Sequence, residues 1–283
     1  MKFGVDSFIW TENFGEKDLW IIPKAKALGF EVIDFAIANP FTFPTAKVKA
    51  ELKQVDIDCV CTTTLTIDTN PISPDAAIRK KAVEAMKKAV DICNELGAPI
   101  LGGVNYAAWG YLTKRPRTDQ EWKWSVAYMR EVAEYAQKTG TVTICVECIN
   151  RFETHFLNVA EDGVKFCKDV GLDNVKVHLD CFHMNIEETS FAEAVQTCGK
   201  KYLGYIHVNE SNRGIPGTGH VPFKEFFRAV KTVGYEGPLV IESFDPSFVE
   251  LAGNCAIWRK LAASGEELAV KGLENLKKIA LAL

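Results

Sequence analysis

The sequence lacks the features that mark membrane, secreted and nucleic-acid-binding proteins. No segment approaches the run of about 18 apolar residues that a membrane helix requires. The opening MKFGVDSFIWTENFGEKD breaks its short apolar stretch at Asp6 and Ser7, unlike a secretory signal or a transit peptide. Positive charge is not in excess, because the net charge is −4, whereas proteins that contact phosphates usually carry a basic face. We therefore expect a cytoplasmic protein with no membrane and no nucleic acid among its partners.

A disulfide framework and the common phosphate-binding motifs are also missing. The nine cysteines are an odd number scattered through apolar segments, so we interpret them as small buried residues in a reducing cytosol. Cys145 and Cys148 form a C-x-x-C, but on a strand this spacing points the two thiols to opposite faces. No G-x-G-x-x-G follows the first apolar segment, and the glycine-containing loop at 213–219 lacks the Lys-Ser/Thr of a P-loop.

What is present is a repeated pattern of an amphipathic stretch, a glycine and a short apolar run. The chain has 283 residues, of which 47% are hydrophobic and 25% charged, as is usual for a globular protein. A glycine just past a helix can adopt the left-handed conformation that ends it. The glycines at these places are Gly29, Gly97, Gly140, Gly171, Gly199 and Gly234.

The short apolar runs are rich in Val, Ile and aromatic residues and predict buried parallel strands. Eight are expected: Phe3–Ile9, Val32–Ala36, Cys59–Thr64, Ile100–Gly103, Thr143–Glu147, Val175–Leu179, Tyr205–Val208 and Leu239–Ser243. The helices between them include Asp75–Leu96 and Asp119–Lys138. Strict alternation of strand and helix, with no linker or low-complexity tract, favours an α/β fold in which residues 1–283 form a single (β/α)8 TIM barrel.

Polar residues end the last four predicted strands, one on each: Glu147, Asp180, His207 and Glu242. In such a barrel the carboxyl ends of the strands form the active-site face. Three neighbouring carboxylates repel one another unless a cation lies among them. Carboxylates with one imidazole suit Mn²⁺, Mg²⁺ or Co²⁺ better than a thiolate-rich zinc site. Each residue alone could equally be a strand-end cap or an ion-pair partner, but all four together favour one divalent metal site.

For the other histidines, sequence position is weaker evidence of a functional role. His178 shares a strand face with Asp180, and we interpret it as a structural residue. His155 and His220 lie in loops and are expected to be solvated. For His183, three residues past Asp180, a functional and a structural role remain equally open.

Loop charges and aromatic residues near the same rim are further candidates. Glu153 and Arg213 follow the fifth and seventh predicted strands, where charges are usually solvated. Phe8, Trp10 and Trp109 could form the apolar wall of a sugar site, although tryptophans are more often core residues.

Four runs of the second half resemble the ketose 3-epimerases, the tagatose/allulose 3-epimerase family. They are VECINRFETH at 146–155, NVKVHLDCFHMNIEE at 174–188, GYIHVNESNRGIPG at 204–217 and VIESF at 240–244. The opening MKFGV and the segment LGGVNYAAW that ends at Trp109 fit the family more loosely. The resemblance therefore covers essentially the whole chain, and its second-half motifs are long and specific.

The resemblance implies a metal-dependent TIM barrel that inverts C3 of a free ketose, with one divalent metal per subunit, Mn²⁺ first and Co²⁺ or Mg²⁺ as alternatives. It places Glu147, Asp180, His207 and Glu242 at the metal-ligand positions. Glu147 and Glu242 also fall on the acid/base positions. Glu153, His183 and Arg213 fall on positions that hold the O1 to O3 end of the sugar, and Trp109 joins them as a candidate substrate contact. A homodimer or homotetramer is expected.

Two segments depart from the family pattern. Asp6 stands where family members carry an aromatic residue, and the segment 62–66 is more polar than usual. Both are expected to face the C4 to C6 end of the sugar, so they put the preferred ketose in doubt.

The expected reaction removes the C3 proton to give an enediolate and returns a proton to the opposite face, with one glutamate on each side. An aldose–ketose (or hydroxypyruvate-type) isomerase on the same barrel is the alternative, because it needs the same metal and glutamates. A zinc-dependent DNA-repair endonuclease would need more histidines and a basic groove, and a non-catalytic sugar-binding barrel would need no acid/base pair.

Overall fold

Eight short segments rich in β-branched residues form one closed parallel barrel in chain order, with β8 hydrogen-bonded to β1. The computed structural model describes residues 1–283. The strands are β1 (Lys2–Asp6), β2 (Val32–Ala36), β3 (Asp58–Thr62), β4 (Ile100–Gly102), β5 (Thr143–Glu147), β6 (Val175–Asp180), β7 (Leu203–His207) and β8 (Pro238–Ile241). This topology confirms the predicted (β/α)8 barrel.

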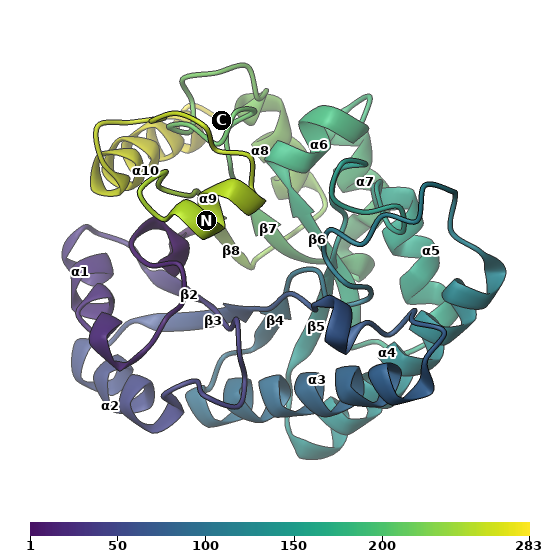
Figure 1. Ribbon diagram of the computed structural model, residues 1–283. Helices are drawn as coiled ribbons and strands as arrows, with labels where there is room; N and C mark the ends of the chain where they lie inside the picture. The colour runs from purple at the N-terminus through teal and green to yellow at the C-terminus, as the bar shows by residue number, and fades with distance from the viewer.

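The helices surround the ring of strands (Figure 1). They are α1 (Ile21–Ala27), α2 (Thr45–Val55), α3 (Ala76–Leu96), α4 (Asp119–Thr139), α5 (Ala160–Val170), α6 (Cys181–Glu187), α7 (Phe191–Tyr202), α8 (Phe223–Thr232), α9 (Val249–Asn254) and α10 (Gly265–Leu281). Three 3-10 turns complete the chain: η1 (Ser7–Ile9), η2 (Glu16–Asp18) and η3 (Ile67–Thr69). No helix combines the length and the apolar character that crossing a membrane demands.

The predicted bounds agree with these elements to within a few residues. β2 and β5 match their predicted ranges, and α3 begins directly after Asp75, whose carboxylate accepts a hydrogen bond from the backbone N–H of Ala77. The prediction that the first strand continues to Ile9 was wrong. The Asp6 carboxylate accepts a hydrogen bond from the N–H of Phe8 at 2.6 Å and starts η1 there.

Most of the glycines expected to end helices do so in the left-handed conformation. At Gly97 φ is 74°, and at Gly171 it is 77°, and both residues directly follow a helix. The expectation was wrong at Gly140, where φ is 178° and the backbone is extended. Glycine is favoured there for a different reason, because a Cβ would collide with the side-chain Oδ1 of Asn94.

The barrel interior has an apolar layer below a polar one. Its apolar layer is a separate cluster of six buried residues: Val32, Val60, Ile100, Cys145, Tyr205 and Val240. Strand residues two apart share a face. The residues two positions beyond the apolar layer therefore also point inward, nearer the carboxyl ends of the strands, and form the polar layer. They are Asp34, Thr62, Gly102, Glu147, His207 and Glu242. The larger core, of 71 buried residues, fills the space between the strands and the surrounding helices.

Candidate metal centre and active site

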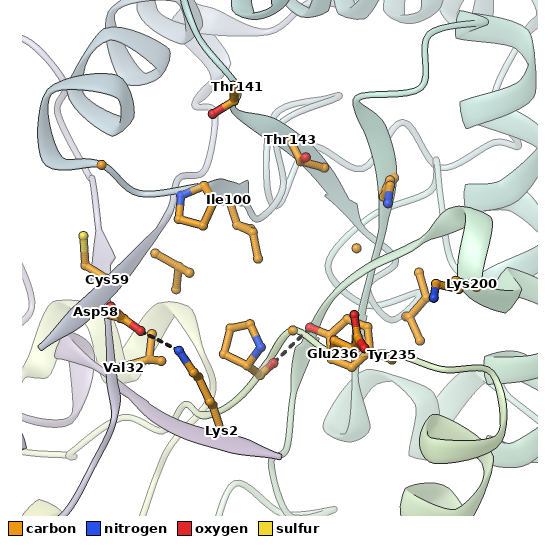
Figure 2. A pocket seen from close by; sticks show the side chains of 18 of the residues that line it. Lys2, Val32, Asp58, Cys59, Ile100, Thr141, Thr143, Lys200, Tyr235 and Glu236 are labelled. Carbon is orange, nitrogen blue, oxygen red and sulfur yellow. Dashed lines mark hydrogen bonds and ion pairs between the residues drawn. The ribbon is translucent and has the colours of Figure 1, made fainter.

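Two cavities lie at opposite ends of the barrel. The larger, about 570 Å³, opens at the amino ends of the strands, where Lys2 pairs with Asp58 at 2.7 Å (Figure 2). It contains none of the residues predicted to carry chemistry. The other, about 180 Å³, lies at the carboxyl ends, where chemistry is found in this fold. Glu147, Glu153, His183, Arg213 and Glu242 line it together with Trp109.

The four residues predicted to bind metal converge at the floor of this second cavity, which Glu147 and Glu242 line directly. Glu147, Asp180 and His207 are the last residues of β5, β6 and β7, and Glu242 directly follows β8. Parallel pairing aligns Asp180 with His207. In three overlapping groups, the possible ligand atoms lie within 4.8 Å of one another: Asp180–His207–Glu242, Glu147–Asp180–His183 and Glu147–His178–His207. The buried cluster is consistent with a divalent metal site.

His207 presents a ring nitrogen suited to a metal. Its Nδ1 lies 3.4 Å from Glu242 Oε2 and 3.9 Å from Asp180 Oδ2, and it is buried without a hydrogen-bond partner. Its other nitrogen, Nε2, lies 3.2 Å from Asp34 Oδ2. A carboxylate accepts but does not donate, so Asp34 holds the proton on Nε2, and Nδ1 is the nitrogen that faces Asp180 and Glu242 and would bind a cation between them. This donor set fits a divalent cation.

Burial and mutual repulsion shift the ionisation of these carboxylates. Burial raises the pKa of Glu147 well above its usual value, and the charge of Glu242 raises it further. Burial also raises the pKa of Asp180, although Arg213 opposes the change. Burial alone would raise the pKa of Glu242, but the charges of Arg213 and His207 hold it well below the usual range. Burial would lower the pKa of His207, but the charge of Glu242 and the hydrogen bond to Asp34 keep it well above its ordinary value.

Arg213 is the positive charge that the protein itself supplies to this cluster. Its Nη1 donates to Glu242 Oε2 at 2.6 Å and to Asp180 Oδ2 at 3.0 Å. The guanidinium lies 4.2 Å from the ring centre of Phe182 and 5.1 Å from that of Phe244, a favourable cation–π position. Its backbone has a φ of 61°, which is uncommon outside glycine. The sequence favoured a solvated loop charge in isolation, whereas the residue is buried.

His183 directs one nitrogen into the cavity. Its Nδ1 accepts a hydrogen bond from the backbone N–H of Asn150 at 3.1 Å, and its Nε2 lies 3.2 Å from the donor Nη2 of Arg213. Nε2 lies 3.7 Å from Glu147 Oε1 and 3.9 Å from Asp180 Oδ2. Burial, reinforced by the charge of Arg213, lowers the pKa of His183 well below its ordinary value. A neutral imidazole, held between Asn150 and Arg213, therefore lies beside both carboxylates.

Glu153 and Trp109 form one unit at the edge of the cavity. The indole Nε1–H of Trp109 donates to Glu153 Oε2 at 2.8 Å, and the Asn150 side chain donates to Oε1 at 2.7 Å. The carboxylate is thereby held at the cavity edge. Trp109 is a cavity residue, as is Phe8, whereas Trp10 is absent from the lining and packs against the core.

The three remaining histidines lie in different surroundings: one is in the candidate metal cluster, one is exposed, and one is mostly buried in a loop. His178 is fully buried, neither of its ring nitrogens has a hydrogen-bond partner, and Nδ1 lies 3.8 Å from Glu147 Oε2. It therefore lies within the candidate metal cluster, closer than the structural interpretation implied. His220 is exposed, as expected. The prediction that His155 is solvated was wrong, because its ring is mostly buried and Nδ1 donates to the carbonyl of Tyr111 at 3.0 Å.

The two segments expected to face the far end of the sugar behave differently. Thr64 lines the cavity. Asp6 does not, because its side chain is fully buried below the cavity beside Asp34 and His207. The expectation was therefore wrong for Asp6.

Several polar residues of the site were missed by the sequence analysis. Asn209 donates to Asp180 Oδ2 at 2.7 Å and accepts from the backbone N–H of Glu242 at 2.7 Å. Glu210 is buried and accepts backbone N–H groups of its own loop, including that of Gly217 at 3.0 Å. Asp34 lies at the middle of β2, where the strand-end argument does not apply, but a lone carboxylate inside the apolar run VIDFA was a visible signal. No sequence signal distinguishes Asn209 from an ordinary loop residue.

Residues 22–279 match the family of xylose isomerase-like TIM barrels. The L-ribulose 3-epimerase of Methylomonas sp. (strain DH-1) is 34% identical over 281 residues, which is 98% of this chain and 97% of that protein. The D-allulose 3-epimerase from Methylomonas sp., solved in complex with D-allulose, superposes with a TM-score of 0.93 at 34% identity and covers 98% of this chain and 96% of its own. The D-psicose 3-epimerase from Clostridium cellulolyticum H10 with D-tagatose superposes with a TM-score of 0.89 at 31% identity, over 99% of each chain.

Proposed function

The chain belongs to the ketose 3-epimerases of the xylose isomerase-like TIM-barrel family, and from this premise we propose that it inverts C3 of a free ketose with Glu147 and Glu242 as the acid/base pair. The observation that carries the proposal is that these two glutamates line one cavity and that both lie in the overlapping groups of possible ligand atoms that include Asp180 and His207. β5 and β8 lie on either side of β6 and β7 in the barrel. The glutamates therefore flank the cluster and suit opposite faces of a planar intermediate.

We propose that Glu147, Asp180, His207 and Glu242 hold one divalent cation, with Mn²⁺ preferred and Co²⁺ or Mg²⁺ as alternatives. Oxygen ligands with one imidazole suit these ions. When bound, the cation supplies Lewis acidity that polarises the sugar carbonyl and stabilises negative charge on its oxygens.

The protein's own residues perform the proton transfer. One glutamate removes the C3 proton, which is acidic only because it adjoins the ketone, and the other returns a proton to the opposite face. The guanidinium of Arg213 donates to the oxygens where charge develops, and the imidazole of His183 contacts the same oxygens beside it. Glu153, held by Trp109 and Asn150, accepts the C1 hydroxyl and fixes the end of the sugar. Trp109 and Phe8 supply apolar walls that exclude water.

Deuterium incorporation tests this proposal. The metal-loaded protein is incubated with D-fructose, D-allulose or D-tagatose in D₂O, and products are resolved by chromatography and NMR. We expect 3-epimeric ketoses with deuterium at C3, activity lost with EDTA, and recovery on adding Mn²⁺. Deuterium at C1 with formation of an aldose would instead establish the isomerase alternative, and turnover insensitive to EDTA would contradict the metal site. Sedimentation analysis tests the expected homodimer or homotetramer.

A further inference from the structure

Beneath the candidate metal cluster lies a second polar network, centred on Asp34 at the middle of β2. Asp34 Oδ2 accepts the hydroxyl of Tyr205 at 2.5 Å and lies 3.2 Å from His207 Nε2. Its other oxygen, Oδ1, accepts the hydroxyl of Thr62 at 3.2 Å. Asp34 and Tyr205 have no exposed surface. A buried carboxylate is costly unless hydrogen bonds replace its hydration, and three donors from two other strands meet that need here.

None of these residues lines the cavity in which the sugar would bind. The cavity is formed by residues from the loops and strand ends above, and Asp34, Thr62 and Tyr205 are absent from its lining. The only member of the proposed ligand set that the network contacts is His207. Any effect of the network on the reaction must therefore pass through this imidazole.

The contact decides which nitrogen of His207 faces the ligand set. With Asp34 accepting at Nε2, the ring is fixed with Nδ1 toward Asp180 and Glu242. Reversing the tautomer would place a proton on Nδ1, where a cation needs a lone pair. Two neighbouring rings also pack against the His207 ring. The ring centre of Tyr205 lies 5.0 Å from that of His207, and the ring centre of His178 lies 4.3 Å from it.

A glycine on a nearby strand provides the space that the Tyr205 ring occupies. Gly102 on β4 faces the Tyr205 ring, and a Cβ at this position would lie 2.8 Å from Tyr205 Cδ1. The absence of a side chain at position 102 therefore allows the tyrosine to cross the barrel and reach Asp34 on the opposite side.

We propose that Asp34, held by Tyr205 and Thr62, is a positioning residue that sets the tautomer and orientation of His207 for cation binding. This inference rests on the metal site of the proposed function and deepens it by assigning a carboxylate that does not touch metal or sugar. Partners of this kind typically change metal affinity by roughly 10- to 100-fold when removed.

The test compares Asp34→Asn with the wild type by titrating the metal-free proteins with Mn²⁺ and measuring free Mn²⁺ by EPR. We expect the Kd to rise roughly 10- to 100-fold. At saturating Mn²⁺ the KM for the ketose should be unchanged, because Asp34 lies outside the cavity. The matched control is Asp18→Asn, which also neutralises a buried carboxylate but one that accepts only the backbone N–H of Gly15 at 2.9 Å. Its Kd should equal that of the wild type.

A second measurement needs no variant and holds even if Asp34→Asn fails to fold. In wild-type protein labelled with ¹⁵N-histidine and loaded with diamagnetic Mg²⁺, His207 should carry its proton on Nε2. A proton on Nδ1, or an Asp34→Asn variant with a wild-type Kd, would overturn the inference and leave the proposed function intact. A wild-type protein that binds no divalent cation would overturn the metal site itself.

Discussion

Replacing Arg213 with methionine should destabilise the metal-free protein and make its stability depend more strongly on Mn²⁺. The guanidinium contacts Asp180 and Glu242 at 3.0 and 2.6 Å, and all three side chains are nearly or fully buried. In the absence of a bound cation, Arg213 is the permanent positive charge in contact with these carboxylates. Its loss leaves two buried carboxylates without this counter-charge.

The size of the effect follows from the burial of the pair. Removing one partner of a buried ion pair costs about 3–5 kcal/mol. In a protein of this length 1 kcal/mol corresponds to about 2 °C in Tm, so metal-free Arg213→Met should melt roughly 6–10 °C lower. Mn²⁺ at 100 times its Kd stabilises any folded protein that binds it by about 2.7 kcal/mol. The variant should gain more than the wild type, because the cation replaces the lost charge without competing with Arg213 for the same oxygens.

Differential scanning calorimetry in EDTA, and again with Mn²⁺, measures both quantities. Lys47→Met is the matched control, because this exposed lysine pairs with the exposed Glu16 at 2.6 Å, and its Tm and its response to Mn²⁺ should change little. The reasoning is refuted if Arg213→Met has the wild-type Tm in EDTA, or if Mn²⁺ raises the Tm of both proteins equally.

Three further predictions concern single side chains. Glu147→Gln and Glu242→Gln should each lower kcat by at least about 100-fold, as expected for loss of a general acid or base, while surface Glu84→Gln keeps wild-type turnover; near-normal kcat with bound metal in either variant would contradict the two-glutamate mechanism. Trp109→Phe removes the 2.8 Å bond to Glu153 and should raise KM for the ketose several-fold more than it lowers kcat; equal KM values would separate Glu153 from substrate binding. At Glu121 burial opposes ionisation, but Arg115 and Thr118 lower the pKa from 4.5 to about 2, so its stabilisation is present above about pH 4.5 and lost as the pH falls toward 2. Glu121→Gln should therefore destabilise the protein at pH 7 and have little effect near pH 2, as measured by urea unfolding, and a pH-independent difference would refute this.

The sequence predicted the structure best for features that recur on every strand of the barrel. The short apolar runs and the glycines that precede them predicted all eight strands, and the strand-end argument selected Glu147, Asp180, His207 and Glu242 without any contact information. These predictions depend on local geometry that the barrel repeats at every strand.

The rest depended on contacts between distant segments. Asp6 was placed within a strand continuing to Ile9, although its own side chain ends that strand by capping the following turn. His155 was expected in solvent because a loop's packing against Tyr111 cannot be read from its sequence. Asn150 and Asn209 act through loop conformations that bring their side chains back to His183 and Asp180. Hydrogen bonds of this kind join residues whose proximity the fold alone creates.

The two-layer interior explains how the barrel tolerates so many buried charges in one place. On β2 the inward residues change from Val32 to Asp34, and on β7 from Tyr205 to His207, within a single step of the strand. The apolar layer stabilises the barrel by burial and lies between the polar layer and the large cavity at the amino-terminal end. Water from that side therefore does not hydrate the carboxylates. Their charge is balanced from within, by hydrogen-bond donors and by Arg213, and the proposed cation would add a further counter-charge from the carboxyl-terminal mouth.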